Sequence, residues 1–117
     1  MKKKDDGFKT YVLDQLRGLR GVTARAMFGG HGLYKEGIFF AAVTEGRLFF
    51  RVSDETRPAY EEAGMPPFAP YGMKPMRSYF EVPSDVVESP PRLVEWAKDA
   101  VVSARAAKLK KSKKKKT

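Results

Sequence analysis

The sequence predicts one α+β domain of two layers, in which helices pack on an antiparallel sheet of four or five strands. Between residues 29 and 52, short runs rich in phenylalanine and valine alternate with glycines, a pattern typical of β-hairpins with glycine-containing turns. Apolar residues recur at helical spacing near both ends of the chain. With 117 residues, the chain can bury a single hydrophobic core but not two.

A first helix is predicted before residue 20. Its apolar residues follow one another mostly at intervals of three or four positions and form one stripe: Phe8, Tyr11, Val12, Leu16 and Leu19. Asp5 or Asp6 is the expected N-cap, and Gly18 and Gly21 bracket the end of the helix.

The strands are predicted from alternation and from phenylalanine-rich runs. Residues 22–28 alternate loosely, and we expect the chain to turn or bulge at the glycine-rich link 29–32 before the next strand. The other expected strands are 33–34, 38–43, 47–52 and 76–82.

Two phenylalanine pairs, Phe39–Phe40 and Phe49–Phe50, lie in the expected hairpin. Because successive side chains of a strand point to opposite faces, one ring of each pair faces the helices and the other faces away. The outward rings either form an exposed apolar patch, which would suit a homodimer, or are covered by the proline-rich segment 65–75. In that segment Phe68 and Tyr71 are expected to pack inward.

Two further helices are predicted. One is short, about 54–63, with Ser53 or Asp54 as its N-cap and Pro58 in its first turn. The other begins at Ser89-Pro90-Pro91 and runs to about residue 106 along an apolar stripe. We therefore divide the chain into a domain, residues 1–106, and a basic tail, residues 107–117, which has almost nothing to bury and is expected to be disordered.

The net charge of +9 comes from the two ends of the chain. Residues 10–104 hold eleven basic and twelve acidic residues, whereas residues 105–117 hold eight basic residues and no acidic one.

Lysines on a flexible chain attract phosphate without reading bases, so non-specific nucleic acid is one expected partner of the tail. A solubilising tail without a dedicated partner is the other interpretation. A membrane is not favoured, because no lipid or amphipathic anchor accompanies the lysines. The tail lysines are Lys108, Lys110, Lys111, Lys113, Lys114, Lys115 and Lys116.

Composition excludes several classes of protein. There is no cysteine, which excludes disulfides and thiolate zinc sites. No apolar run approaches the length of a membrane span, and the lysines at the N-terminus are followed by two aspartates rather than by an apolar segment. We therefore expect a soluble protein of the cytoplasm.

One motif resembles a known family. Its residues run from Arg25 to Tyr34 and resemble the opening of the TfoX/Sxy N-terminal domain family: Arg25, Met27, Phe28, Gly29, Gly30, Gly32, Leu33 and Tyr34. Weaker matches follow in the family's order: Gly37, Phe39, Arg47-Leu48-Phe49, Pro67-Phe68, Tyr79, Val82-Pro83 and Trp96-Ala97. The resemblance covers roughly residues 8–106.

The resemblance implies an α+β fold with an antiparallel sheet, related to the architecture of secretion chaperones. It also implies a regulator of natural competence that acts with a protein partner, such as the cyclic-AMP receptor protein. The family's regulators carry a second, C-terminal domain, whereas this chain ends in lysines. The family offers no catalytic residues to carry over.

The residues themselves give little support to catalysis. The link Gly29–Gly32 could cradle a phosphate, but a strand rather than a helix N-terminus is expected after it, so we interpret these glycines mainly as structural. His31, the only histidine, lacks the partners of a metal or nucleophile site and is expected in an exposed loop. We assign no catalytic residue, metal ligand or cofactor. A non-enzymatic regulatory or protein-binding module is the first hypothesis. A small enzyme or ligand-binding domain, with a pocket between the Gly29–Gly32 loop and residues 65–75, is the alternative.

Overall fold

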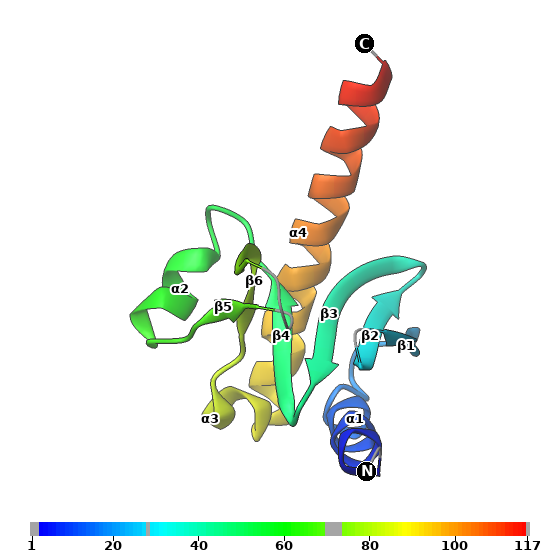
Figure 1. Ribbon diagram of the computed structural model, residues 1–117, viewed down its shortest axis with the longest axis vertical. Helices are drawn as coiled ribbons and strands as arrows, with labels where there is room; N and C mark the ends of the chain where they lie inside the picture. The colour runs from blue at the N-terminus through cyan, green and yellow to red at the C-terminus, as the bar shows by residue number, and fades with distance from the viewer. Residues whose placement is uncertain (1–2, 28, 70–73, 117) are drawn as a thin grey trace.

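The computed structural model describes residues 3–27, 29–69 and 74–116 and confirms the α+β class (Figure 1). The elements in chain order are α1 (Lys3–Gln15), β1 (Val22–Met27), β2 (Gly30–Lys35), β3 (Ile38–Thr44), β4 (Arg47–Arg51), α2 (Arg57–Glu62), β5 (Pro67–Phe68), β6 (Met76–Glu81), α3 (Ser84–Val87) and α4 (Pro90–Lys116). The strands form one antiparallel sheet in the order β1-β2-β3-β4-β6-β5.

The first four strands are a meander with tight turns. The loops β2–β3 and β3–β4 have two residues each, and in both a glutamate is followed by a glycine, with positive φ at both positions. The φ values are 51° and 79° for Glu36 and Gly37, and 51° and 72° for Glu45 and Gly46. Positive φ at both loop residues is what a two-residue hairpin turn matching the twist of the strands requires. The glycines at 37 and 46 therefore mark the turns as predicted.

The sheet has six strands, at least one more than expected, because Pro67–Phe68 within the proline-rich segment pairs with β6. Residues 70–73, including Tyr71, lie outside the described part of the chain. Phe68 packs inward as predicted, being 3% exposed, but it does so on the face of the sheet opposite the helices.

The main core lies between the sheet and the helices. It contains Phe40, Phe50 and Phe80 from the strands together with side chains of all four helices. The principal helical contributors are Val12 of α1, Tyr60 of α2, Val86 of α3, and Leu93, Ala97, Ala100 and Val101 of α4. The predicted division of the phenylalanine pairs between the two faces is confirmed. Phe40 and Phe50 face the helices, and Phe39 and Phe49 face away.

Helix α1 begins and ends earlier than expected. It starts at Lys3, so Asp5 and Asp6 lie inside it rather than at its cap, and it ends at Gln15. Leu16 and Leu19 still reach the core from the turn that follows, where the Leu19 amide donates to the Leu16 carbonyl at 2.8 Å. The apolar stripe therefore predicts which residues are buried, but not the bounds of the helix.

Helix α2 is also shorter than the predicted range of 54–63. Ser53 caps the preceding turn, because its hydroxyl accepts from the amides of Glu55 and Thr56 at 3.2 and 3.3 Å. The helix itself begins after Thr56, and Pro58 lies in its first turn as expected. Residues 84–87, between the last predicted strand and the last predicted helix, form the short helix α3.

Helix α4 continues ten residues beyond its predicted end near 106 and reaches Lys116. Ala104 is its last buried residue, and Lys108 and Leu109 are exposed. The helix therefore extends past the predicted end of the domain, while the expected disorder of residues 107–117 stays a prediction. Alanine, leucine and lysine favour helix, so the segment continues the helix that precedes it. Figure 1 shows α4 extending past the sheet, at the opposite end of the molecule from the N-terminus.

Candidate functional site

The residues of the Arg25–Tyr34 motif form a hairpin of β1 and β2. Arg25 and Met27 lie in β1, Gly29 lies in the turn with φ of 75°, and Gly30, Gly32 and Tyr34 lie in β2. Phe28 lies outside the described residues. Only Gly29 has the positive φ that glycine readily adopts, so the other glycines of the motif need another explanation.

Close packing explains Gly30 and Gly32. A Cβ atom on Gly30 would overlap the carbonyl oxygen of Val43 and lie 2.9 Å from Thr44 Cα. A Cβ atom on Gly32 would lie 2.7 Å from the sulfur of Met27 and 2.8 Å from the ring of Phe39. The two glycines therefore let β3 approach β2 and let Met27 and Phe39 lie across β2.

The motif does not form a phosphate loop. Gly30, His31 and Gly32 are part of a strand, and β2 continues from them without a helix N-terminus. His31 is half-buried and pairs with Val43, so the prediction of an exposed loop histidine is wrong. The reason is that the turn needs only two residues, which places the remaining glycines in the ladder.

The face of the sheet away from the helices, here called the second face, carries a continuous series of aromatic rings. Tyr34 lies 5.3 Å from Phe39, and Phe39 lies 5.5 Å from Tyr79, between ring centroids. Phe68 covers Phe49 at 4.7 Å and contacts Tyr79 at 6.5 Å. Phe49 is only 3% exposed, so the described residues favour the covered alternative over an exposed phenylalanine patch.

An arginine lies over each end of this series. The guanidinium of Arg25 is 5.5 Å from the ring centre of Tyr34, and that of Arg51 is 5.5 Å from the ring centre of Tyr79. We call Arg25, Tyr34, Phe39, Tyr79 and Arg51 the aromatic row. Tyr34 and Phe39 are half-buried, Tyr79 is buried, and Arg25 is exposed. Cation–π contact of this kind orients a guanidinium over a ring without neutralising its charge.

Among these residues, Arg51 has a side-chain nitrogen that lacks a hydrogen-bond partner among the described residues. Its Nε is buried and has no hydrogen-bond partner within the described part of the chain. Burial raises the pKa of the Tyr79 hydroxyl, and the hydrogen bond and positive charge of Arg51 oppose that rise. The positive charge of Arg51 thus lies against Tyr79 without a carboxylate partner among the described residues.

The second candidate is the basic end of α4. Arg105 is 3.4 Å from Glu36 in the β2–β3 turn, the last contact of this helix that we describe with the sheet. The helix then carries the seven tail lysines on its final turns, from Lys108 onward. These lysines thus belong to the same helix that packs on the core.

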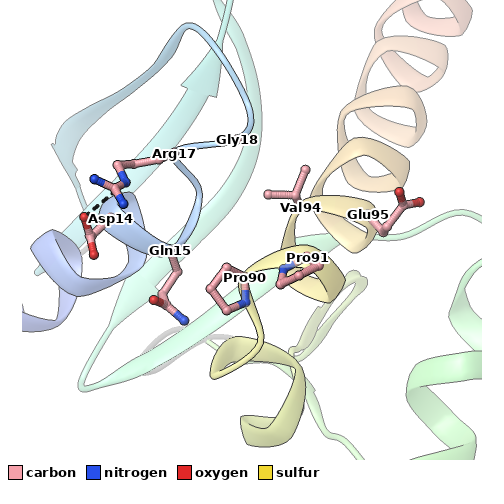
Figure 2. A pocket seen from close by; sticks show the side chains of 8 residues that line it. All are labelled: Asp14, Gln15, Arg17, Gly18, Pro90, Pro91, Val94 and Glu95. Atoms are coloured by element: carbon pink, nitrogen blue, oxygen red, sulfur yellow. Dashed lines mark ion pairs between the residues drawn. The ribbon is translucent and has the colours of Figure 1, made fainter.

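Two grooves occur beside α1. One, of about 460 Å³, lies between the end of α1 and the start of α4 and is lined by Asp14, Gln15, Arg17, Gly18, Pro90, Pro91, Val94 and Glu95 (Figure 2). The other, of about 280 Å³, lies between α1, the β3–β4 turn and α3. Neither is lined by residues 29–32 or 65–69. Residues 28 and 70–73 lie outside the described part of the chain, so the pocket predicted there stays a prediction.

Two carboxylates at α2 and the turn before it form ion pairs with arginines. Asp54 is 2.9 Å from Arg57, and Glu61 is 3.0 Å from Arg77. Within residues 3–27, 29–69 and 74–116, no three histidine, aspartate or glutamate side chains gather as a metal site would require. In the same ranges, no helix is long and apolar enough to cross a membrane.

The sequence alone missed the aromatic row. Arg51 and Tyr79 are 28 positions apart, and they meet because β4 pairs with β6, in a register that sets Arg51 opposite Tyr79. The alternation within each strand predicts which residues share a face, but not which strands are neighbours. The contact between Arg25 and Tyr34, in contrast, lies within the hairpin of β1 and β2 and follows from its register.

Comparison with known proteins identifies the family. The TfoX N-terminal domain matches residues 14–104 of this chain, which include every element from β1 to α3 and most of α4. The DNA transformation protein TfoX1 of Aliivibrio fischeri (strain ATCC 700601 / ES114) is 34% identical over 92 residues, which are 76% of this chain. The chain spans 44% of the length of that relative. The motif, the fold and these matches agree, and the chain belongs to the TfoX N-terminal domain family.

Proposed function

We propose that this protein is a non-enzymatic regulatory module of DNA transformation that binds DNA without sequence preference through the basic end of α4. The sheet and its covering helices would then present surfaces to a protein partner. The name of the relative, a DNA transformation protein, supports the pathway. Because the chain spans under half of that relative, the role is proposed here and not transferred whole.

The observation that carries the DNA proposal is the continuity of α4. Its last buried residue is Ala104, and the helix then runs on to Lys116 with seven lysines and no acid. A short basic segment neutralises phosphates and releases their counterions, which favours binding to any duplex. The segment contains no arginine after Arg105 and no aromatic residue, so base readout is not expected of it.

The charge of residues 10–104 supports the proposal that DNA binding belongs to the end of α4 and partner binding to the rest of the domain. Residues 10–104 carry a formal net charge of −1, so they offer duplex DNA no general attraction. A domain of this kind would bring a partner to DNA that α4 holds.

The test compares three full-length chains on a random-sequence duplex. In the glutamine-tail variant, each tail lysine is replaced by glutamine (Lys108, Lys110, Lys111, Lys113, Lys114, Lys115 and Lys116), and in the arginine-tail variant each is replaced by arginine. Glutamine keeps the helix propensity and removes the charge, whereas arginine keeps both. We expect the glutamine-tail variant to lose at least about tenfold in duplex affinity by fluorescence anisotropy and the arginine-tail variant to lose little. Equal affinities of all three chains would refute the proposal.

A further inference from the structure

The second face of the sheet is not covered by a helix in the described part of the chain. The main core takes residues from α1, α2, α3 and α4, whereas the cluster on the second face is built from strand residues alone. Its buried members are Ala42, Phe49, Phe68 and Tyr79. Toward β1 and β2 the cover ends, and Tyr34 and Phe39 are only half-buried. Among the described residues, nothing buries this part of the face fully.

The charge beside these rings is positive. The other arginine of β4 on this face, Arg47, is 3.8 Å from Glu81 and is therefore partnered. Neither Arg25 nor Arg51 makes an ion pair within the described residues, and the buried Nε of Arg51 has no acceptor there. A negatively charged ligand that accepts hydrogen bonds would complement the charge of both arginines, and a phosphate diester has this chemistry.

The glycine motif shapes this surface. The register aligns Arg25, Gly32 and Ala42 across three strands, so small residues lie directly beside Arg25. Because Gly32 has no Cβ, the ring of Phe39 lies close over β2, where it meets Tyr34 at 5.3 Å. The result is a shallow strip of rings with a guanidinium at either end.

We propose that the aromatic row binds single-stranded DNA, with bases stacked on Tyr34 and Phe39 and phosphates held by Arg25 and Arg51. Unpaired bases expose the ring faces that such stacking needs, and a duplex does not. The planar guanidinium of Arg25, already set over Tyr34, extends the stack. An acidic peptide would satisfy the arginines but would leave the rings without stacking partners. The choice of DNA over RNA rests on the proposed function, and the single-strand preference does not.

The experiment measures the preference of the full-length protein for a single strand over a duplex. The probes are a labelled oligothymidine of about 20 nucleotides and a duplex of the same length, at one salt concentration. We expect the oligothymidine to bind at least about tenfold more tightly than the duplex. An oligomer of the same length that keeps the sugar–phosphate chain but lacks bases should lose that preference, because it cannot stack.

Substitutions then locate the site. In each of the single variants Arg25→Gln and Arg51→Gln, we expect the ratio of oligothymidine affinity to duplex affinity to fall to about one. Duplex affinity itself should stay within about twofold of wild type, because α4 is intact. Arg25→Lys keeps the charge but not the planar group, so its ratio should lie between those of wild type and Arg25→Gln. The matched control is Arg92→Gln, which removes an exposed arginine paired with Asp85 at 3.1 Å on the helical side and should change neither affinity. Arg25 is exposed, so its substitution should leave the fold intact; unchanged fluorescence of Trp96, which packs on Tyr60 beneath the other face, checks this.

The outcomes separate this inference from the proposed function. The glutamine-tail variant should lose duplex binding and keep its preference for oligothymidine over the duplex. If that variant keeps its duplex affinity, the proposed function fails while the single-strand site can stand. A wild-type protein that binds both probes equally, or a preference that survives Arg25→Gln and Arg51→Gln, overturns the inference. Tighter binding of oligouridine than of oligothymidine overturns the assignment to DNA.

Discussion

Gly30 lies so close to Val43 that no side chain fits between β2 and β3 at this position. A Cβ atom on Gly30 would overlap the Val43 carbonyl oxygen and lie 2.9 Å from both Cα and Cβ of Thr44. Gly30 is buried and does not have positive φ, so space and not backbone conformation excludes other residues. The motif that first suggested the family is thus tied to the packing of the central hairpin.

Gly30→Ala is expected to lower the free energy of unfolding by at least about 2 kcal/mol, because the backbone of β3 must move to admit the methyl group. Gly7→Ala is the matched control. Gly7 lies inside α1 with nothing within 4 Å of an added Cβ, so alanine should raise stability by about 0.5–1 kcal/mol through its helix propensity. Urea titration of the three chains measures both changes. A Gly30→Ala chain as stable as wild type would contradict this account of the motif.

Phe68→Ala should destabilise the fold and uncover the second face. Phe68 is 3% exposed and its ring lies 4.7 Å from that of Phe49, so the expected loss is about 3 kcal/mol. The exposed Phe49 should also make the protein self-associate with rising concentration, which sedimentation velocity would detect.

Phe50→Leu serves as the control for Phe68→Ala, because Phe50 faces the helices and its loss lowers stability without opening the second face. We expect the Phe50→Leu chain to be less stable than wild type but to stay at the wild-type association state. Self-association of both variants to the same extent would show that destabilisation, rather than the uncovered Phe49, is the cause.

Tyr60 makes stability sensitive to alkaline pH. Burial raises the pKa of its hydroxyl above the ordinary value, and the charge of Asp99 adds to the rise. In the unfolded chain the tyrosine ionises near pH 10, so above that pH the unfolded state loses the proton first and is stabilised. The contribution of Tyr60 is therefore full below about pH 10 and is lost progressively above it.

Tyr60→Phe should remove this part of the alkaline loss. Between pH 9 and 11 we expect the free energy of unfolding to fall by about 1 kcal/mol less in Tyr60→Phe than in wild type. Tyr11→Phe, at a ring that is 41% exposed, is the control and should keep the wild-type fall. Urea titrations at the two pH values measure the difference, and identical falls in all three chains would rule out this role of Tyr60.

Local signals predicted the hairpins and the two faces of the sheet. Gly37 and Gly46 mark tight turns because their positive φ is a local requirement, and the paired phenylalanines divide between the faces because alternation is a property of one strand. The helix bounds were harder, since Leu16 and Leu19 are buried from a turn rather than from the helix itself. A stripe of buried residues reports the tertiary environment, not the backbone conformation.

Contacts that depend on strand order could not be predicted from the sequence. Phe68 covers Phe49 only because β5 and β4 both neighbour β6, and Arg51 meets Tyr79 through the same pairing. Neither contact leaves a local pattern in the sequence. The end of α4 lies beyond the predicted residue 106 for a different reason: the apolar stripe ends near Ala104, whereas lysine, a good helix former, lets the backbone continue without burial.

Replacing the seven tail lysines by glutamine should leave the folded domain unchanged. Among the side chains that the structure describes, Ala104 is the last buried one of α4, and all substituted positions follow it. We expect the free energy of unfolding of the glutamine-tail variant to stay within about 0.5 kcal/mol of wild type. A larger loss would mean that the end of α4 packs on the protein and is not available to DNA.

The salt dependence of duplex binding tests the central claim most directly. If α4 holds DNA through its lysines, the logarithm of the binding constant should fall linearly with the logarithm of salt concentration. The expected slope is about −3 to −6 for wild type, since each neutralised phosphate contributes about −0.9. The arginine-tail variant should keep this slope, and the glutamine-tail variant should have a slope near zero with little binding left. A wild-type slope near zero, or the same steep slope in the glutamine-tail variant, would contradict the claim that the end of α4 is the DNA-binding element.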